Sequence, residues 1–249
     1  MKNNAKALLE QHLKQEHAIS PFSTYLKEIV YGGIDGIITT FAVVAGFSGA
    51  QGGIADPALP TLTVLLFGFA NLFADASSMG LGNFLSVRAN QDVYKKEQAK
   101  ERHEIEHNTE FEKEETRQML MGKGFTPEQA EKLTLLYATN KEYWTEFMMK
   151  EELEMQNPLG ENPLITGIIT AASFMIFGLT PLVPYVLFKG YLGNEFTLSL
   201  IFAFVALILL GFLRWKVARQ GFLRSIGETV FIGSISAGVA YLVGTFFRV

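Results

Sequence analysis

The chain contains 249 residues, of which 49% are hydrophobic and 18% are charged, and its formal net charge is −4. Residues 87–161 hold 11 Lys and Arg against 17 Asp and Glu, a net charge of −6, so the rest of the chain carries +2. Long apolar blocks nearly free of charge exclude a single soluble globule. The lack of a long basic run argues against nucleic-acid binding, which needs a cationic face. The absence of cysteine excludes disulfides and thiolate metal sites.

The first segment, residues 1–28, is predicted to be a cytosolic amphipathic leader that lies on the membrane surface. Ser20 followed by Pro21 fits the N-cap and the first position of a helix that leads into the apolar part of the chain. One face of the leader would carry three leucines: Leu8, Leu9 and Leu13.

Five stretches are long and apolar enough to cross a bilayer, which takes roughly 20 helical residues. Each contains at most one charged residue, namely Asp35 in the first, Asp75 in the second and Glu228 in the fifth. The sequence therefore predicts an all-α polytopic membrane protein. Its transmembrane helices are expected at residues 29–50, 60–86, 163–188, 196–213 and 225–247.

Lys and Arg gather at one set of span ends, and such residues favour the cytosol. Lys27 precedes the first span, and the link between the last two spans carries Arg214, Lys216, Arg219 and Arg224. The N-terminus and residues 87–161 are therefore predicted to be cytosolic, and with five spans the C-terminus lies outside. The expected domains are the leader at 1–28, spans one and two at 29–86, an acidic domain at 87–161 and spans three to five at 162–249.

Three helices are predicted in the acidic domain. The second span has no helix breaker after Asn83, so it is expected to continue as one rod to about Met121, before the glycines at 122 and 124. A capping-box sequence at 126–129 predicts a second helix over 127–138. The third is expected to open at Thr139, with Glu142, and to end near Met155.

Five carboxylates would share a stripe about 80° wide on the predicted rod. Like charges at this spacing oppose a helix, and a divalent cation that bridges them would reverse the effect. The alternative is a solvated charge run without a ligand, although Ile105, Phe111 and Met119 lie on or beside the stripe. Glu106, Glu110 and Glu114 point the other way, as ordinary solvated charges do. The stripe consists of Glu97, Glu101, Glu104, Glu112 and Glu115.

Two thioethers and a carboxylate follow on the predicted third helix. Met148, Met149 and Glu152 can point toward one site, and this combination fits a borderline transition metal better than Ca²⁺ or Mg²⁺. The alternative is that both methionines fill a core against Trp144 and Phe147.

The segment His103–His107 matches H-E-x-x-H, the signature of zinc proteases. The surrounding helix is highly charged and has no apolar face that could shape a dry catalytic pocket. The other histidines, His12 and His17, lie in the leader. The match is therefore interpreted as a chance occurrence in a Glu-rich helix.

Carboxylates inside the bilayer usually face a partner or a water-filled path. Asp35 lies among three glycines, which let another helix approach or leave room for water. Asn71, Asp75 and Met79 are spaced by four residues and form one polar stripe, a candidate cation path. The alternative is that Asn71 and Asp75 hydrogen-bond neighbouring helices. Glu228 stands in the first turn of its helix, where the macrodipole favours an acid.

The chain resembles the vacuolar iron transporter family. The resemblance rests on IVYGGIDGIITTFAVVAG at 29–46, on ADASSMGLGNFLS at 74–86, on the Glu-rich insert and on the five spans. Asp35 matches the family's translocation acid and Met79 its span-two methionine. Relatives can carry an acid where this chain has Asn71, and many have Glu where Asn83 stands. The family's cytosolic metal ligands correspond to Glu101, Glu104, Glu112, Glu115, Met148, Met149 and Glu152.

The resemblance implies a homodimeric, proton-coupled exporter of Fe²⁺ with its path between the first and second spans of the two subunits. Fe²⁺ would be a substrate rather than a bound cofactor, and Mn²⁺, Zn²⁺ or Co²⁺ would be further substrates. The expected location is a bacterial inner membrane, and the chain is not expected to be an enzyme. Two alternatives stay open: a metal sensor, and a membrane-anchored di-iron carboxylate oxidase for which Glu104 and His107 supply one Glu-x-x-His element.

Overall fold

The structure, a computed structural model, describes residues 20–50, 58–188, 194–219 and 221–246. The chain forms two compact units. The membrane unit comprises Met1–Asn83 and Leu164–Val249, and the acidic unit comprises Phe84–Pro163. Most of the predicted amphipathic leader lies outside the described residues. Its end is the short helix α2 (Pro21–Thr24), where the Ser20 Oγ accepts a hydrogen bond from the Ser23 amide at 3.1 Å.

Within the described residues, five helical segments are long and apolar enough to span a membrane. The all-α, five-span prediction is confirmed, and the protein is a multi-pass membrane protein. The segments are α3 (Leu26–Ala50), the first part of α4 (Ala58–His107), α8 (Pro163–Gly178) with α9 (Val183–Leu187), α10 (Glu195–Ala218) and α11 (Phe222–Phe246).

The third span is not the continuous helix that its composition suggested. It breaks after Gly178 into the 3-10 turn η1 (Thr180–Leu182) and then the short α9. Pro181 and Pro184 lack the amide hydrogen that an uninterrupted helix needs, which explains the break. A side chain compensates in part, because the Ser199 Oγ of α10 donates to the Pro181 carbonyl at 2.7 Å.

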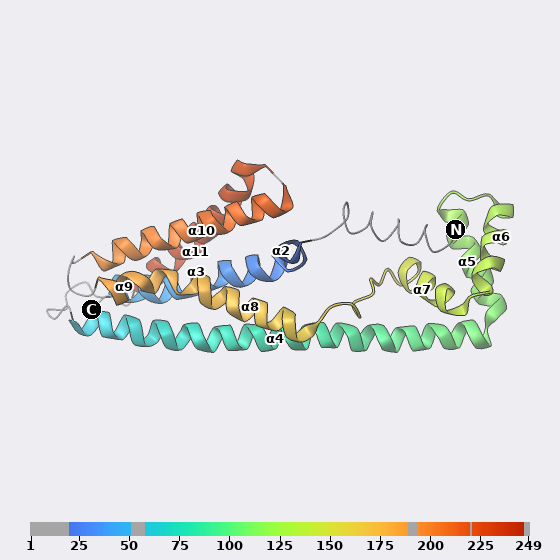
Figure 1. Ribbon diagram of the computed structural model, residues 1–249, viewed down its shortest axis with the longest axis horizontal. Helices are drawn as coiled ribbons and strands as arrows, with labels where there is room; N and C mark the ends of the chain where they lie inside the picture. Colours follow the sequence, from blue (N-terminus) through green and yellow to red (C-terminus); the bar gives the residue numbers. More distant parts are fainter. Residues whose placement is uncertain (1–19, 51–57, 189–193, 220, 247–249) are drawn as a thin grey trace, which may run out of the picture. The chain divides into compact units, whose positions relative to one another are not determined.

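Helix α3 is the centre of the membrane unit. On one side Ile37, Phe41 and Ala45 pack against the small and branched side chains of α10. On another side Val44 joins a cluster with α4, α8 and α9 that includes Leu72. Figure 1 shows α3 running beside α10 and α11. The first span is therefore surrounded by protein over much of its circumference.

The backbones of α3 and α8 approach each other closely at Gly36 and Gly178. A Cβ on Gly36 would strike the carbonyl of Phe174, and a Cβ on Gly178 would lie 2.9 Å from the carbonyl oxygen of Gly36. Small residues allow such contact, and packing of this kind holds membrane helices together. The predicted approach of another helix to the glycines around Asp35 is thus observed.

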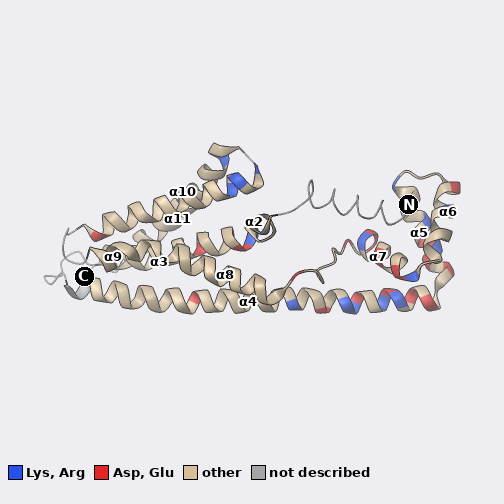
Figure 2. Ribbon diagram, in the orientation of Figure 1, with Lys and Arg blue, Asp and Glu red and all other residues tan. Residues whose placement is uncertain are grey.

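Large apolar side chains remain exposed along the spans, as a lipid solvent permits. Leu66, Phe73, Ile176 and Leu209 are each more than half exposed. Charged residues gather in the acidic unit and at helix ends, with few along the spans, as Figure 2 shows.

The predicted single rod from span two to Met121 is wrong. Helix α4 ends at His107, Asn108 takes a non-helical conformation with φ −122° and ψ 35°, and α5 (Thr109–Gly122) follows. Asn is a weak helix former, so a break costs little there. The break also lets Ile105 of α4 and Thr116 of α5 both become buried in the acidic unit.

The two remaining helices of the acidic unit lie close to their predicted places. Helix α6 (Pro127–Ala138) begins with the predicted capping box, in which Thr126 and Gln129 cap each other. Helix α7 (Lys141–Glu151) is shorter than expected at both ends. Its N-cap is Asn140 rather than Thr139, because the Asn140 side chain accepts from the Tyr143 amide at 3.2 Å.

A small core closes the acidic unit. Ile105, Trp144 and Met148 are almost fully buried, and Met119, Tyr137 and Phe147 pack around them. The Trp144 Nε1 donates to the Thr116 Oγ1 at 2.8 Å, which joins α7 to α5. The Gln91 side chain of α4 donates to two carbonyls in the segment after α7, those of Pro158 and Glu161.

Because the obstacle at Gly36 is backbone, Gly36→Ala is expected to destabilise the membrane unit by about 1–3 kcal/mol, the usual cost of overpacking. The thermal unfolding midpoint of the protein in detergent measures this effect. Gly46→Ala is the matched control on the same helix, since its Cβ would meet nothing within 4 Å. Equal midpoints for the two variants would contradict the assigned contact.

Candidate functional site

The most deeply buried acids of the acidic unit are Glu101 on α4 and Glu112 on α5. Their side chains are 3% and 4% exposed, and the two carboxyl groups are hydrogen-bonded to each other. The predicted stripe brought them together along one rod, whereas the break at Asn108 brings them together from two helices. A hydrogen bond between two carboxyl groups requires that one of them holds a proton.

Buried neighbours one turn further along each helix hold these two acids in place. Ile105 follows Glu101 by four residues and packs against Trp144 and Met148. Thr116 follows Glu112 by four residues and accepts the Trp144 indole hydrogen bond. Residues four apart share a helix face, so the burial of one fixes the direction of the other.

The electrostatics of the cluster favour bound protons or a bound cation. Burial, followed by the charges of Glu152, Glu112 and Glu104, raises the pKa of Glu101 to about 8. Burial, followed by the charges of Glu115, Glu152 and Glu104, raises the pKa of Glu112 to about 7. Partial burial and the charges of Glu115 and Glu104 also raise the pKa of Glu152. Four of the five predicted stripe residues thus act on one another.

One oxygen of each central acid has no hydrogen-bond partner among the described residues, namely Glu101 Oε1 and Glu112 Oε2. Leaving a buried polar atom unpaired is costly. No ion pair within the described residues reaches Glu101 or Glu112, because the nearby bases pair elsewhere. Lys100 lies 3.8 Å from Glu104, and Arg117 pairs with Glu114 and Glu131.

A divalent cation would satisfy both unpaired oxygens, and carboxylate ligands suit Fe²⁺ and Mn²⁺. Among the described residues, no three His, Asp or Glu side chains are close enough to hold an ion as they stand. These acids would therefore have to rotate their side chains to coordinate an ion together. The partly exposed Glu104 and Glu115 and the exposed Glu152 have room for it.

The methionines of α7 lie on its buried face, and the Met148 sulfur already has a partner. Met148 and Met149 are both fully buried. The Thr116 Oγ1 donates to the Glu112 carbonyl at 2.8 Å and lies 3.3 Å from the Met148 sulfur, and Met148 packs in the core with Ile105 and Trp144. The core-filling alternative therefore describes Met148 as it stands. Met149 is not part of that core cluster.

The remaining acids of α4 and α5 divide as follows. Glu97 forms an ion pair with Lys96 at 3.6 Å and is not among the charges that act on Glu101 or Glu112. Glu106, Glu110 and Glu114 are exposed, as expected for solvated charges.

Glutamates of α4 and α5, together with the one that follows α7, form the group described above. We call it the carboxylate cluster; it consists of Glu101, Glu104, Glu112, Glu115 and Glu152.

Each of the first two spans carries one acid. Asp35 of α3 and Asp75 of α4 are both partly buried in the membrane unit. Asp35 also lines a hollow of about 780 Å³ between α3, α10 and α11, to which Lys27 and Arg214 contribute. An acid pair on two apolar helices is a natural place for a cation.

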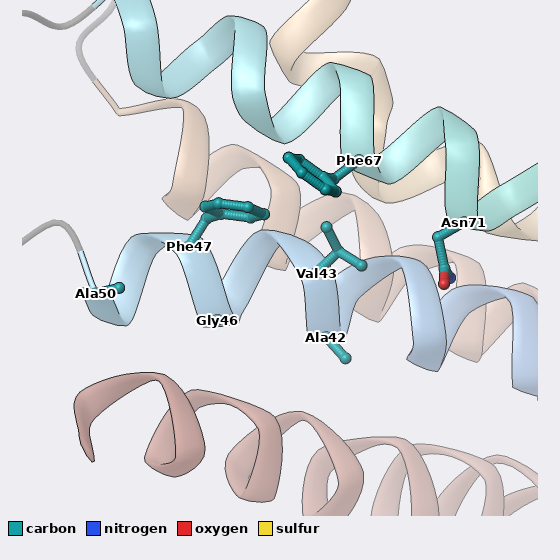
Figure 3. A pocket seen from close by; sticks show the side chains of 7 residues that line it. All are labelled: Ala42, Val43, Gly46, Phe47, Ala50, Phe67 and Asn71. Carbon is teal, nitrogen blue, oxygen red and sulfur yellow. The ribbon is translucent and has the colours of Figure 1, made fainter. Parts of the chain in front are cut away.

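The other two residues of the span-two stripe have different surroundings. Asn71 lines a hollow of about 320 Å³ between α3 and α4, and Figure 3 shows it reaching from α4 toward α3. Phe47 and Phe67 face each other in the same hollow, with ring centroids 5.5 Å apart. Met79 is partly buried against the core around Phe174.

Two residues near these sites were not singled out by sequence reasoning. Thr116 links Trp144 to Met148, and a threonine within a charged helix gave no sign of this. Arg214 was counted only as a basic residue, yet its guanidinium forms an ion pair with Glu228 at 2.8 Å. The Glu228 carboxylate also pairs with Arg224 at 2.9 Å. The expectation that Glu228 stands in the first turn of its helix is wrong, because α11 begins at Phe222, and Glu228 is instead held by its ion pairs.

The sequence matches the model of the VIT family over residues 26–245, nearly the whole chain. The chain belongs to the VIT family. It is 32% identical to a protein named vacuolar iron transporter from Toxoplasma gondii, over 93% of this chain and 77% of that protein. It is 34% identical to a vacuolar iron transporter of Plasmodium falciparum, over 88% of this chain and 81% of that protein. It is 29% identical to vacuolar iron transporter 1 of Arabidopsis thaliana, over 95% of this chain and 90% of that protein.

Family membership confirms the resemblance seen in the sequence. It also confirms that the chain belongs to a transporter family and is not an enzyme. The protease signature at His103–His107 and the di-iron oxidase alternative are thereby set aside.

The raised pKa values predict how the stability of the metal-free protein depends on pH. The ordinary pKa of a glutamate is 4.5. Between this pH and a pH of about 8, Glu101 and Glu112 together bind more protons in the folded protein than they do in the unfolded chain. The stability of the acidic unit therefore falls as the pH rises through this window. We expect unfolding at a lower urea concentration at pH 8.5 than at pH 6, measured with a chelator present.

Trp144 fluorescence in a Trp215→Phe background reports on the acidic unit alone, since these are the two tryptophans of the chain. The variant Glu101→Gln/Glu112→Gln is the control and should lose most of the pH dependence. Equal or greater stability of the parent protein at pH 8.5 would contradict the raised pKa values.

Proposed function

We propose that this protein exports Fe²⁺ from the cytosol in exchange for protons and carries Mn²⁺ as a second substrate. The observation that carries this proposal is that α3 and α4, two apolar spans of a VIT-family membrane unit, each hold one partly buried acid, Asp35 and Asp75. Relatives at about 30% identity are named vacuolar iron transporters, which supports iron as the cargo.

Proton coupling follows from the chemistry of a carboxylate pair. Two like charges in a medium of low dielectric constant favour any state that neutralises them, whether by a metal ion or by protons. A carboxyl group that accepts a proton loses charge and metal affinity together, so metal and proton compete for Asp35. Met79, which follows Asp75 by one helical turn, adds a soft ligand that suits a transition metal better than Ca²⁺ or Mg²⁺.

The carboxylate cluster is proposed to collect metal for transport. Its buried, unpaired oxygens favour a divalent ion, and its negative charge raises the local concentration of cations. Met149 and Met148 are proposed to join it when an ion binds, which requires Met148 to exchange its Thr116 contact for the metal.

The proposed orientation places the acidic unit and the N-terminus in the cytosol and the C-terminus outside. Lys27 and Arg214 support it, because both line the hollow at Asp35 and so mark one basic end of the membrane unit. The resemblance further implies a homodimer with its path between the α3 and α4 helices of the two subunits. A bacterial inner membrane is the proposed location.

The direct test is Fe²⁺ uptake into proteoliposomes that contain a pH-sensitive dye, with and without an imposed proton gradient. We expect metal entry coupled to proton movement in the opposite direction, and competition by Mn²⁺. Metal binding without flux in correctly inserted protein would refute the proposal in favour of a sensor.

Asp35→Asn is expected to abolish Fe²⁺ flux, because an amide neither titrates nor offers a charged ligand. Binding of metal at the carboxylate cluster should be unchanged, and equilibrium dialysis of the same variant measures it. Asp92→Asn is the control with the same chemical change at an exposed acid of the acidic unit, and it should transport normally. Flux at the parent rate in Asp35→Asn would overturn the assigned role.

The variant Glu101→Ala/Glu104→Ala/Glu112→Ala/Glu115→Ala is expected to lose cytosolic metal binding and to keep reduced transport. The control removes four exposed acids of the same unit, Glu106, Glu110, Glu114 and Glu142, and so changes the net charge equally. If both variants lose the same number of bound ions, bulk charge rather than the cluster binds the metal.

A further inference from the structure

The last turn of α4 carries two imidazoles that the proposed function does not use. His103 and His107 are exposed, their ring centroids are 3.9 Å apart, and their planes are inclined by 33°. Side chains four residues apart lie on one helix face, one above the other. The rings are therefore paired and accessible from solvent.

The hydrogen bond of one ring fixes its tautomer. The His107 Nδ1 lies 2.9 Å from the His103 carbonyl oxygen. A carbonyl only accepts, so Nδ1 carries the hydrogen, and in a neutral imidazole Nε2 then holds the lone pair that a metal can bind. Metal-bound histidines commonly donate their second nitrogen to a carbonyl in this way, which orients the ring toward the ion.

The electrostatic surroundings also suit a cation. The exposed carbonyls at the C-terminal end of a helix carry partial negative charge, and α4 ends at His107. The nearby bases are engaged by acids, since Lys100 lies 3.8 Å from Glu104 and Arg102 lies 3.9 Å from Glu142. Glu106 between the two histidines is exposed and adds negative charge.

We propose that His103 and His107 form an auxiliary site for a borderline divalent metal ion of the Zn²⁺, Ni²⁺ or Cu²⁺ class, with water completing the coordination. Imidazole suits these ions, and the general order of affinities places Fe²⁺ below them. The site is separate from the carboxylate cluster, because Glu101 and Ile105 of the same helix are buried while both histidines are exposed. It does not depend on transport.

The two rings are close enough to share one ion. Metal–nitrogen bonds of about 2.1 Å at a right angle place the two nitrogens about 3 Å apart. The ring centroids are 3.9 Å apart, and binding would require the rings to rotate until one nitrogen of each faces the ion. The bound ion would cross-link two side chains of the last turn of α4, immediately before the break at Asn108.

Electron paramagnetic resonance of Cu²⁺ bound to the full-length protein in detergent tests the site. A Glu101→Gln/Glu112→Gln background removes competition from the central acids of the cluster. With one equivalent of Cu²⁺ at pH 7.5, we expect hyperfine coupling to two nitrogens. His103→Gln/His107→Gln should abolish this coupling and weaken Ni²⁺ binding at least tenfold in calorimetry.

The matched control is His12→Gln/His17→Gln, which replaces the other two histidines of the chain; both lie outside the described residues. This control should keep the two-nitrogen signal. Coupling that survives in His103→Gln/His107→Gln, or that disappears in the control, would overturn the assignment. Because both imidazoles are exposed, the acidic unit of each variant should remain folded, as Trp144 fluorescence in the Trp215→Phe background would show.

Discussion

The close contact between α3 and α8 determines the arrangement of the membrane unit. Gly36 and Gly178 place backbone against backbone, and no side chain larger than hydrogen fits between them. With α8 seated there, the other faces of α3 remain for α4, α10 and α11. Asp35 stands next to Gly36 in the chain, so the helix packing that glycine permits also sets the position of the acid, beside the hollow that Lys27 and Arg214 line.

The acidic unit follows a different principle, in which acids are buried against their electrostatic preference. A small core of Ile105, Trp144 and Met148 lies beside Glu101 and Glu112, which are held out of water. Burial and the neighbouring carboxylates raise the pKa of both acids, and each keeps one oxygen without a partner among the described residues. In the proposed function, a cation bound there would neutralise this charge and satisfy both oxygens. The same argument explains why a purely solvated stripe, such as Glu106, Glu110 and Glu114, is not equivalent to the cluster.

Much of this fold could be predicted from local sequence. The spans follow from long uncharged stretches, and α6 follows from a capping box whose partners are three residues apart. The break at Asn108 could not be predicted in this way, since its advantage lies in burying Ile105 and Thr116 against α7. The central acids were grouped on a single rod, which the structure replaces by two helices. A helical wheel assumes one continuous helix, so it cannot show Glu101 of α4 and Glu112 of α5 meeting across a bend. Arg214 and Thr116 act through contacts distant in sequence, which no short motif records.

The break in the third span has a consequence for which residues position 199 can accept. Ser199 is fully buried, and its hydroxyl donates to the carbonyl of Pro181, which is itself buried beside the interruption of the helix. In hydrocarbon there is no water to take over this bond. We therefore expect position 199 to accept only small side chains that donate a hydrogen bond, a set that excludes alanine. A proline in the third span thus limits what one position of α10 can accept.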